Sequence, residues 1–263
     1  MPAKLTVIGS ADAFNSAGRG SPCHLVEDDL GAFCVDFGPT ALMELKRRRF
    51  APERLDAVFL THLHGDHFGG LHLLLIDAQY QAFRERPLTI CGPRGTKRHI
   101  EAWYKLAYGR SGEKRQFETI YRELAPGEET EVLGRRVKTF RALHKVPRDG
   151  ALQLRISTGG AVLAFTGDSA WTDQLPQLAA GADVLVSECT ELRGMLTEQH
   201  LSWQVLKPRF ESLDARHIVL AHLGPEMRRA ARRLEAPRVV IADDGYSLTV
   251  GSKRTKKLAK RGS

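Results

Sequence analysis

The residues best suited to chemistry in this sequence lie in one short stretch, 61–70, which reads THLHGDHFGG. It places three imidazoles and one carboxylate within six positions, at His62, His64, Asp66 and His67. The whole chain has ten histidines in 263 residues, so this is a steep local excess. Nitrogen and oxygen donors of this kind bind metal ions. Four of them exceed what one tetrahedral ion takes from a single loop, and we therefore predict two half-built metal sites that distant residues complete.

The residues that precede and follow this stretch indicate how the donors are positioned. An apolar run over 56–60 predicts a buried strand that ends where the histidines begin. In an extended segment the side chains of His62 and His64 project to the same side. Asp66 and His67 follow a turn and are free to face a second point, which fits a division into two sites.

Three polar residues later in the chain share one context, because each follows an apolar run that predicts a strand. They are His144, Asp168 and His222. Strand ends at one edge of a sheet are where a rigid scaffold can bring donors together. None of the three is informative alone, but together they are candidates for completing the two sites.

The motif His-x-His-x-Asp-His after a buried strand, followed by Gly69-Gly70, resembles that of the metallo-β-lactamase superfamily. The three strand-end residues match the later motifs of that family in order. The resemblance implies an α/β fold, namely an αββα four-layer sandwich of two mixed β-sheets flanked by helices. It also implies one metal held by His62, His64 and His144, a second held by Asp66, His67 and His222, and Asp168 bridging both.

This ligand set predicts a hydrolase with two divalent metal ions as cofactors. The donors include no thiolate, which favours Zn²⁺, although manganese and iron also accept nitrogen and oxygen ligands. A water that bridges two such cations loses its proton near neutral pH and becomes the nucleophile. The same cations absorb the charge that builds on the substrate. We therefore expect Asp66 to be catalytic as well as a ligand, and we expect no serine or cysteine nucleophile.

Two further segments, Ser187-Glu188-Cys189-Thr190 and His200-Leu201-Ser202, resemble the paired glutamate and histidine segments of ribonuclease Z-type phosphodiesterases. In that branch the histidine lies near the leaving group and the acid orients it. A positioned histidine can donate the proton that an alkoxide leaving group needs. A neighbouring carboxylate fixes the tautomer and raises the basicity of the ring. The resemblance thus implies that His200 is a general acid supported by Glu188.

The substrate is left open because the sequence departs from that branch at two places. Ribonuclease Z enzymes of bacteria carry a long arm between the segments that match His144 and Asp168, where this chain has only 23 residues. After the last histidine the family has a serine and an arginine-tyrosine pair, whereas this chain reads HLGPE over 222–226. We expect a phosphodiester substrate, either an RNA 3′ end or a small, for example cyclic, phosphodiester.

Two other functions are alternatives. The first is a hydrolase of the same superfamily that acts on a thioester, lactone or lactam, against which the pairing of Glu188 with His200 argues. The second is a non-catalytic RNA-binding protein. The full ligand set argues against it, because seven convergent polar groups are costly to bury without a metal.

The chain length favours a single domain, which the resemblance makes a metallo-β-lactamase-fold domain over 1–251, and the basic residues at its end predict a disordered tail over 252–263. The formal net charge is +8, but six basic residues of the tail account for most of it, since 33 basic and 31 acidic residues remain in the body. The tail can contact nucleic acid. No apolar run is long enough to cross a membrane and no signal peptide is evident, so we expect a cytoplasmic protein. The resemblance also implies a homodimer. The four cysteines fit small apolar core residues: Cys23, Cys34, Cys91 and Cys189.

The remaining periodicities predict the elements that carry these residues. We expect one strand over 131–143 that delivers His144, and a loop over 9–22 beside the metals. The predicted helices cover 39–49, 71–84, 95–108, 202–212 and 225–233.

Overall fold

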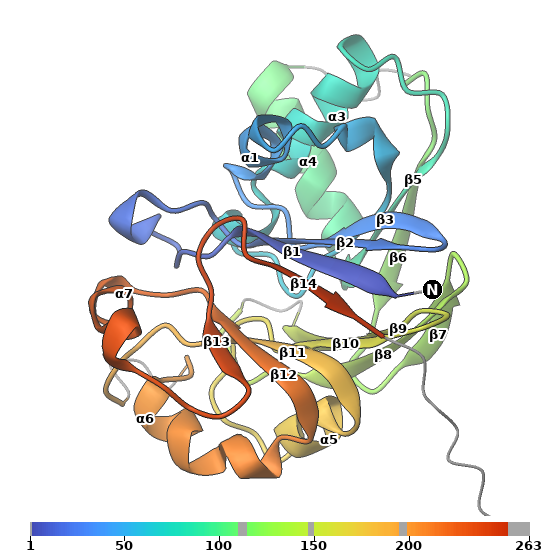
Figure 1. Cartoon of the computed structure of the whole chain (residues 1–263). Coiled ribbons are helices and arrows are strands. Elements are labelled where there is room, and N and C mark those ends of the chain that lie inside the picture. The colour runs from blue at the N-terminus through green and yellow to red at the C-terminus, as the bar shows by residue number, and fades with distance from the viewer. Residues whose placement is uncertain (1, 110–114, 147–149, 195–198, 252–263) are drawn as a thin grey trace, which may run out of the picture.

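Two β-sheets pack face to face in the computed structural model, which describes residues 2–109, 115–146, 150–194 and 199–251. Helices cover the outer face of each sheet, so that four layers are stacked (Figure 1). The predicted αββα sandwich is therefore confirmed. The predicted basic tail lies outside the described residues.

The first sheet has seven strands in the order β14-β1-β2-β3-β4-β5-β6. Strands β3 to β6 run parallel, whereas β14, β1, β2 and β3 pair antiparallel. Helices α1, α3 and α4 lie on its outer face (Figure 1). The elements are β1 (Ala3–Gly9), β2 (Cys23–Asp28), β3 (Gly31–Val35), α1 (Ala41–Arg47), β4 (Leu55–Phe59), α3 (Leu71–Tyr80), β5 (Leu88–Pro93), α4 (Thr96–Tyr108), β6 (Thr119–Leu124) and β14 (Ser247–Val250).

The second sheet also has seven strands, in the order β13-β12-β11-β10-β9-β8-β7. Strands β10 to β13 run parallel and the rest pair antiparallel. Its outer face packs against α5, α6 and the 3₁₀ helix η3. The elements are β7 (Glu129–Val132), β8 (Arg135–Arg141), β9 (Leu152–Ser157), β10 (Val162–Phe165), α5 (Leu175–Ala179), β11 (Ala182–Glu188), α6 (Trp203–Leu206), η3 (Lys207–Ser212), β12 (Ala215–Ala221) and β13 (Val239–Ile241).

The short connecting helices are η1 (Ser16–Gly18), η2 (Pro52–Arg54), α2 (Gly65–Phe68), α7 (Pro225–Ala230) and η4 (Ala231–Arg233). Of the predicted helices, that over 202–212 changes from α to 3₁₀ geometry at Lys207. Pro208 explains the change, because proline has no N–H to donate to the preceding turn.

The prediction of one strand over 131–143 was wrong, because this segment includes a hairpin between β7 and β8. Leu133 and Gly134 both have positive φ, 50° and 77°, which is the backbone of a two-residue hairpin turn. The sequence did not indicate this turn, because leucine is not a typical turn residue. A single glycine within alternating apolar and polar residues is also compatible with a continuous strand. The second strand, β8, still leads toward His144.

The interior between the sheets is apolar, as expected for the inner faces of a sandwich. The four cysteines are buried and form no disulfide, which confirms their predicted role as core residues. No helix within the described ranges is long and apolar enough to cross a membrane.

Candidate metal centre

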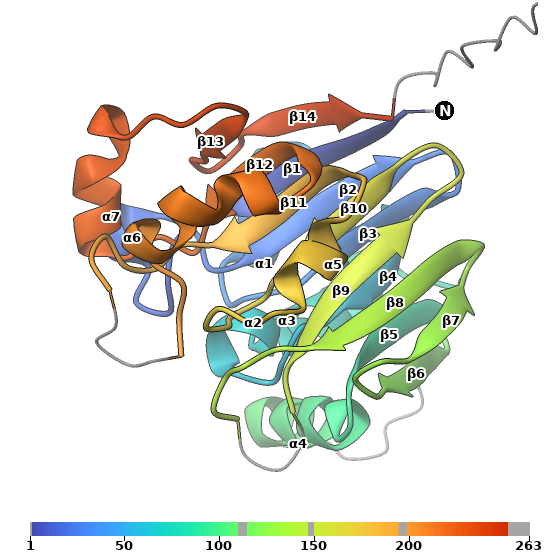
Figure 2. The same cartoon turned by 90° about the horizontal axis from the view of Figure 1, so that it is seen from below.

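Nearly all the predicted site residues follow the ends of strands or lie in the loops that join them to helices, at one end of the sandwich. His62 and His64 follow β4, and α2 holds Asp66 and His67. Strands β8, β10 and β12 run in the same direction, because β9 pairs antiparallel with both β8 and β10 and β12 is parallel to this group. Their carboxyl ends therefore bring three segments to one edge (Figure 2). These segments carry His144, Asp168 and His222.

The turns at this edge adopt left-handed backbone conformations that redirect side chains. Asp36, directly after β3, has φ of 58°, and His222, directly after β12, has φ of 53°. Residues other than glycine rarely adopt this region, and such conformations cluster at functional sites. Gly167 has φ of 53°, and a Cβ atom there would lie 2.7 Å from the Cβ of Thr61. Only glycine fits before Asp168, because its neighbour Thr61 is packed against the backbone.

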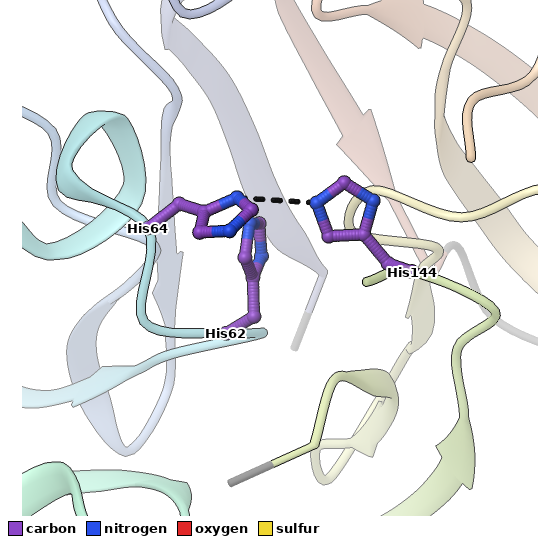
Figure 3. A group of neighbouring side chains, drawn as sticks. All are labelled: His62, His64 and His144. Carbon is purple, nitrogen blue, oxygen red and sulfur yellow. Dashed lines mark hydrogen bonds between the residues drawn. The ribbon is translucent and has the colours of Figure 1, made fainter. Parts of the chain in front are cut away.

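The seven predicted ligands form two adjoining groups. One contains His62, His64 and His144. Nδ1 of His64 lies 3.1 Å from Nε2 of His144 (Figure 3). In the second, Nε2 of His67 lies 3.2 Å from Asp66 and 3.3 Å from Asp168. Ligand atoms of one tetrahedral zinc lie about 3.3 Å apart, since each Zn–N distance is about 2.0–2.1 Å. The spacing therefore suits metal coordination. The second group consists of Asp66, His67, Asp168 and His222.

Asp168 lies between the two groups. Its Oδ1 atom is 3.3 Å from Nε2 of His67, and its Oδ2 atom is 3.4 Å from Nε2 of His222. The same Oδ2 atom is 3.9 Å from Nε2 of His62 and 4.0 Å from Nε2 of His144. One carboxylate thus faces ligands from both groups, which is the position that a bridging ligand requires.

Hydrogen bonds at Nδ1 orient most of the histidine rings. His67 donates to Asp36 at 2.8 Å and His222 to the Thr190 hydroxyl at 2.8 Å. His144 donates to the backbone oxygen of Gln199 at 3.2 Å. His62 lies 3.1 Å from the Thr61 hydroxyl, which itself donates to Asp36. Partners of this kind fix the tautomer and leave Nε2 deprotonated for a metal.

Several buried polar atoms at this site have no hydrogen-bond partner among the described residues. They include Nε2 of His62, Nε2 of His67 and Oδ1 of Asp168. A buried polar group without a partner is costly, so native proteins rarely retain it without a reason. The three atoms belong to the two ligand groups, and divalent cations bound by these groups would satisfy them. The residues present therefore fit a metal.

The charges of the site respond to burial and to one another. Burial lowers the pKa of His67, but the carboxylates of Asp168, Asp66 and Asp36 together raise it well above its usual range. Burial, together with the neighbouring His67, lowers the pKa of His62 well below its usual range. The site thus has more carboxylate charge around the second group, where a cation is best compensated.

Glu188 and His200 meet at the wall of this site, as their resemblance to the phosphodiesterase pair implies. Nδ1 of His200 lies 3.1 Å from each carboxylate oxygen of Glu188, which is buried at the end of β11. Burial lowers the pKa of His200, but the hydrogen bond and charge of Glu188 raise it to about 9. Thr190 donates to Glu188 at 2.6 Å and accepts from His222, so one hydroxyl connects this pair to the metal group.

A pocket of about 700 Å³ opens over the site, and several ligand residues form its floor. His200 forms part of the wall, together with Thr190 and Gln199. The loop over 9–22 contributes Phe14 to the rim, as the prediction of a loop beside the metals requires. This volume is within the usual range of small-molecule sites.

Four residues that orient the predicted ligands were not found from the sequence: Asp36, Thr61, Thr190 and Gln199. Asp36 alone carried a signal, because it ends an apolar run as the predicted ligands do. Thr190 belongs to the segment that carries Glu188, but nothing in its sequence indicates a bond to His222.

Comparison with known proteins places this geometry in a family. A family described as the beta-lactamase superfamily domain matches residues 33–241. The chain belongs to the β-lactamase superfamily. Ribonuclease Z of Mycobacterium bovis (strain BCG / Pasteur 1173P2) is 32% identical over 194 residues, which span 70% of this chain and 69% of that protein. The chain is thus a ribonuclease Z-like member of the superfamily and a metal-dependent hydrolase of the phosphodiesterase type.

Solved structures agree with the assignment of the fold. The metallo-β-lactamase fold protein YhfI from Bacillus subtilis has 25% identity and a TM-score of 0.77, over 95% of this chain and 100% of that one. The short form of human tRNase Z has 22% identity and a TM-score of 0.77, over 93% of this chain and 98% of that one. The second similarity shows the fold alone.

Proposed function

We propose that this superfamily member hydrolyses phosphodiesters with two divalent cations, zinc by preference, and with His200 as general acid. The observation that carries the proposal is the hydrogen bond between Glu188 and His200 at the wall of a pocket whose floor is the ligand cluster. A thioester needs such an acid less, because a thiolate departs without a proton. The pair therefore disfavours thioesters, and the similarity of the chain to ribonuclease Z favours phosphodiesters over lactones and lactams.

The proposed cations are held in two groups that share Asp168. His62, His64 and His144 hold one, and Asp66, His67 and His222 hold the other. When bound, the cations supply an activated water and positive charge for the developing oxyanion. Asp36 and Thr190 keep the rings of His67 and His222 in the binding tautomer.

In this proposal His200 delivers a proton to the leaving oxygen. Its Nδ1 atom is engaged with Glu188, so that Nε2 is the nitrogen that faces away from the carboxylate. The raised pKa of His200, about 9, keeps the ring protonated at neutral pH. A protonated ring that lines the pocket meets the requirement of a general acid for an alkoxide.

The substrate we propose is an RNA 3′ end or a small phosphodiester. The relative named ribonuclease Z supports RNA. The pocket volume, about 700 Å³, exceeds what a phosphate alone needs and accommodates a nucleotide. The cytoplasmic location, the homodimer and nucleic-acid contact through the tail stay predictions.

The leaving group provides the test. His200→Ala should lower kcat by roughly 10²–10⁴-fold on a phosphodiester with an alkoxide leaving group, where a proton is needed. It should cost much less on bis(p-nitrophenyl) phosphate, because p-nitrophenolate departs without a proton. Metal content should be unchanged. His217→Ala, which alters an exposed histidine on β12, is the matched control and should affect neither substrate.

Equal loss on both substrates with metal retained would reassign His200 to the stabilisation of phosphoryl charge. No loss on either would remove it from the reaction. Failure of the parent protein to hydrolyse either ester, while it turned over a thioester or a lactam, would refute the phosphodiesterase proposal as a whole.

A further inference from the structure

A second hollow of about 430 Å³ adjoins the catalytic pocket on the side of α7. The two share Arg193 and Glu226 in their walls, so they are continuous at these residues. The hollow is also lined by Arg229 and Arg233, which lie on α7 and η4. We call Arg193, Arg229 and Arg233 the arginine groove.

The arginine groove presents positive charge that the described part of the chain does not neutralise. All three side chains are exposed, and no hydrogen bond or ion pair joins them to any described residue. Several other arginines of this protein are paired with carboxylates, as Arg48 is with Glu44. One carboxylate, that of Glu226, faces three guanidinium groups in the groove. The excess of positive charge beside the catalytic pocket suits an anion.

Phe14, on the rim of the same catalytic pocket, is a second unusual feature. Its side chain is 86% exposed, although phenylalanine is usually buried. The loop that carries it is held from within, because the buried carboxylate of Asp12 accepts the backbone N–H groups of Phe14 and Ser16. The Ser16 hydroxyl donates to the same carboxylate at 2.9 Å. An aromatic ring is thus held in solvent by an internally bonded loop.

The loop and the groove lie on the same side of the molecule. The short helix η1, which follows Phe14, contacts α7, and α7 carries Arg229. Figure 2 shows the loop over 10–22, α6 and α7 gathered at one end of the sandwich. Phe14 and the arginine groove therefore both border the catalytic pocket on the side of α7.

We propose that Phe14 and the arginine groove bind a single-stranded polynucleotide segment that continues from the scissile phosphate. Phe14 stacks on a base, and the three arginines contact successive backbone phosphates. Aromatic platforms combined with a basic groove are how proteins bind single strands with little sequence preference. The inference rests on the proposed function, since it assigns the part of the substrate that lies beyond the metals. It favours a polynucleotide over a small cyclic phosphodiester.

Binding of a fluorescent single-stranded RNA decamer with phosphorothioate linkages tests the proposal without turnover. The variant Arg229→Glu/Arg233→Glu should weaken binding about 10-fold or more at low salt. It should also reduce the slope of log Kd against log salt by about 1.4, because each lost phosphate contact of a single strand contributes about 0.7. The control Arg49→Glu/Arg136→Glu makes the same charge change at exposed positions outside the groove and should bind almost as the parent does.

Phe14→Ala tests the stacking contact separately. It should weaken binding of the decamer by roughly 5-fold or more, since stacking on one base contributes about 1–3 kcal/mol, and it should leave the salt slope unchanged. An abasic decamer should bind to Phe14→Ala and to the parent equally. Hydrolysis of bis(p-nitrophenyl) phosphate, which tests the proposed function, should be normal in Arg229→Glu/Arg233→Glu, because neither arginine lines the catalytic pocket.

Three results would overturn the inference. One is equal weakening by the groove variant and its control, which would reduce the effect to net charge. Another is unchanged decamer binding in the groove variant. The third is an equal effect of Phe14→Ala on the abasic and normal strands. Loss of ester hydrolysis in the parent protein would refute the proposed function but not the binding site.

Discussion

The two ends of the β-sandwich both bury charged groups between or beside the sheets. They differ in whether these groups have hydrogen-bond partners within the protein. At the end away from the metal centre, Arg135 of β8 forms hydrogen bonds of 2.8 and 2.7 Å with the carboxylate of Asp28 of β2. Both side chains are 0% exposed, and the guanidinium group lies 5.0 Å from the ring of Phe33. This ion pair joins the two sheets and is satisfied within the protein.

At the other end, the ligand cluster keeps buried atoms for which the described residues offer no partner. The metal-ligand carboxylates and imidazoles there are held by surrounding hydrogen bonds, but Nε2 of His62, Nε2 of His67 and Oδ1 of Asp168 have no partner among the described residues. A site that must bind a cation needs such atoms free, whereas a link between sheets needs them paired. The comparison indicates that one end of the sandwich uses its buried charges to join the two sheets, whereas the other keeps them for metal binding at a cost in stability.

The largest effect should come from removing the carboxylate that faces both ligand groups. Asp168→Ala should lower kcat by roughly 10³-fold or more, because metal catalysis contributes several kcal/mol to the transition state. The variant should also hold less metal per chain than the parent, measured by elemental analysis after purification. A fully active variant with normal metal content would exclude Asp168 from the site.

The end of the sandwich away from the metal centre should lose stability when one partner of its ion pair is removed. Arg135→Ala leaves the buried Asp28 carboxylate without a cation, which should lower the free energy of unfolding by about 3–5 kcal/mol. Chemical denaturation measures this loss. Turnover at denaturant concentrations below the unfolding transition should be normal. Arg136→Ala, in which an exposed neighbour is removed, is the control and should change stability little.

The double variant Asp28→Leu/Arg135→Met sharpens the same comparison. Because it removes both charges together, it should recover most of the lost stability. If the double variant were as unstable as Arg135→Ala, the pair would act through its shape and not through its charges.

A smaller effect is expected at the hydroxyl that connects His222 with Glu188. Thr190→Val keeps the shape but removes the hydrogen bond to each partner, and it should lower metal affinity or kcat roughly 10–100-fold. Thr190→Ser should restore most of the loss, because it keeps the hydroxyl. Equal loss in both variants would mean that packing, and not the hydrogen bonds, is what matters at this position.

The smallest effect should be a shift in pH dependence. Glu188 raises the pKa of His200 to about 9, so the acid form is present at neutral pH and is lost as the pH rises through that value. Glu188→Gln removes the charge and should move the alkaline fall of kcat to lower pH. The pH profile on an alkoxide ester measures the shift, and the same profile for both proteins would show that Glu188 does not tune the acid.

The sequence by itself determined much of this protein. The motif over 62–67, the apolar strands and the single polar residues at their ends selected the residues that the structure brings together, and their resemblance to a family predicted the fold. These signals are local, because a strand and the ligand residue that follows it are close together in the sequence. The pairing of Glu188 with His200 was also readable, but only through resemblance to a family.

Only the tertiary structure decided which groups hold the ligands in place. Asp36 and His67 are 31 positions apart, and Thr190 and His222 are 32 apart, so neither hydrogen bond leaves a pattern in the sequence. The ion pair of Asp28 with Arg135 spans 107 positions. The burial of His24 is likewise not evident from the sequence. In the structure this burial lowers the pKa of His24 to about 3 and keeps its ring neutral between the sheets. Such contacts depend on how two sheets face each other, and that arrangement exists only once the chain has folded.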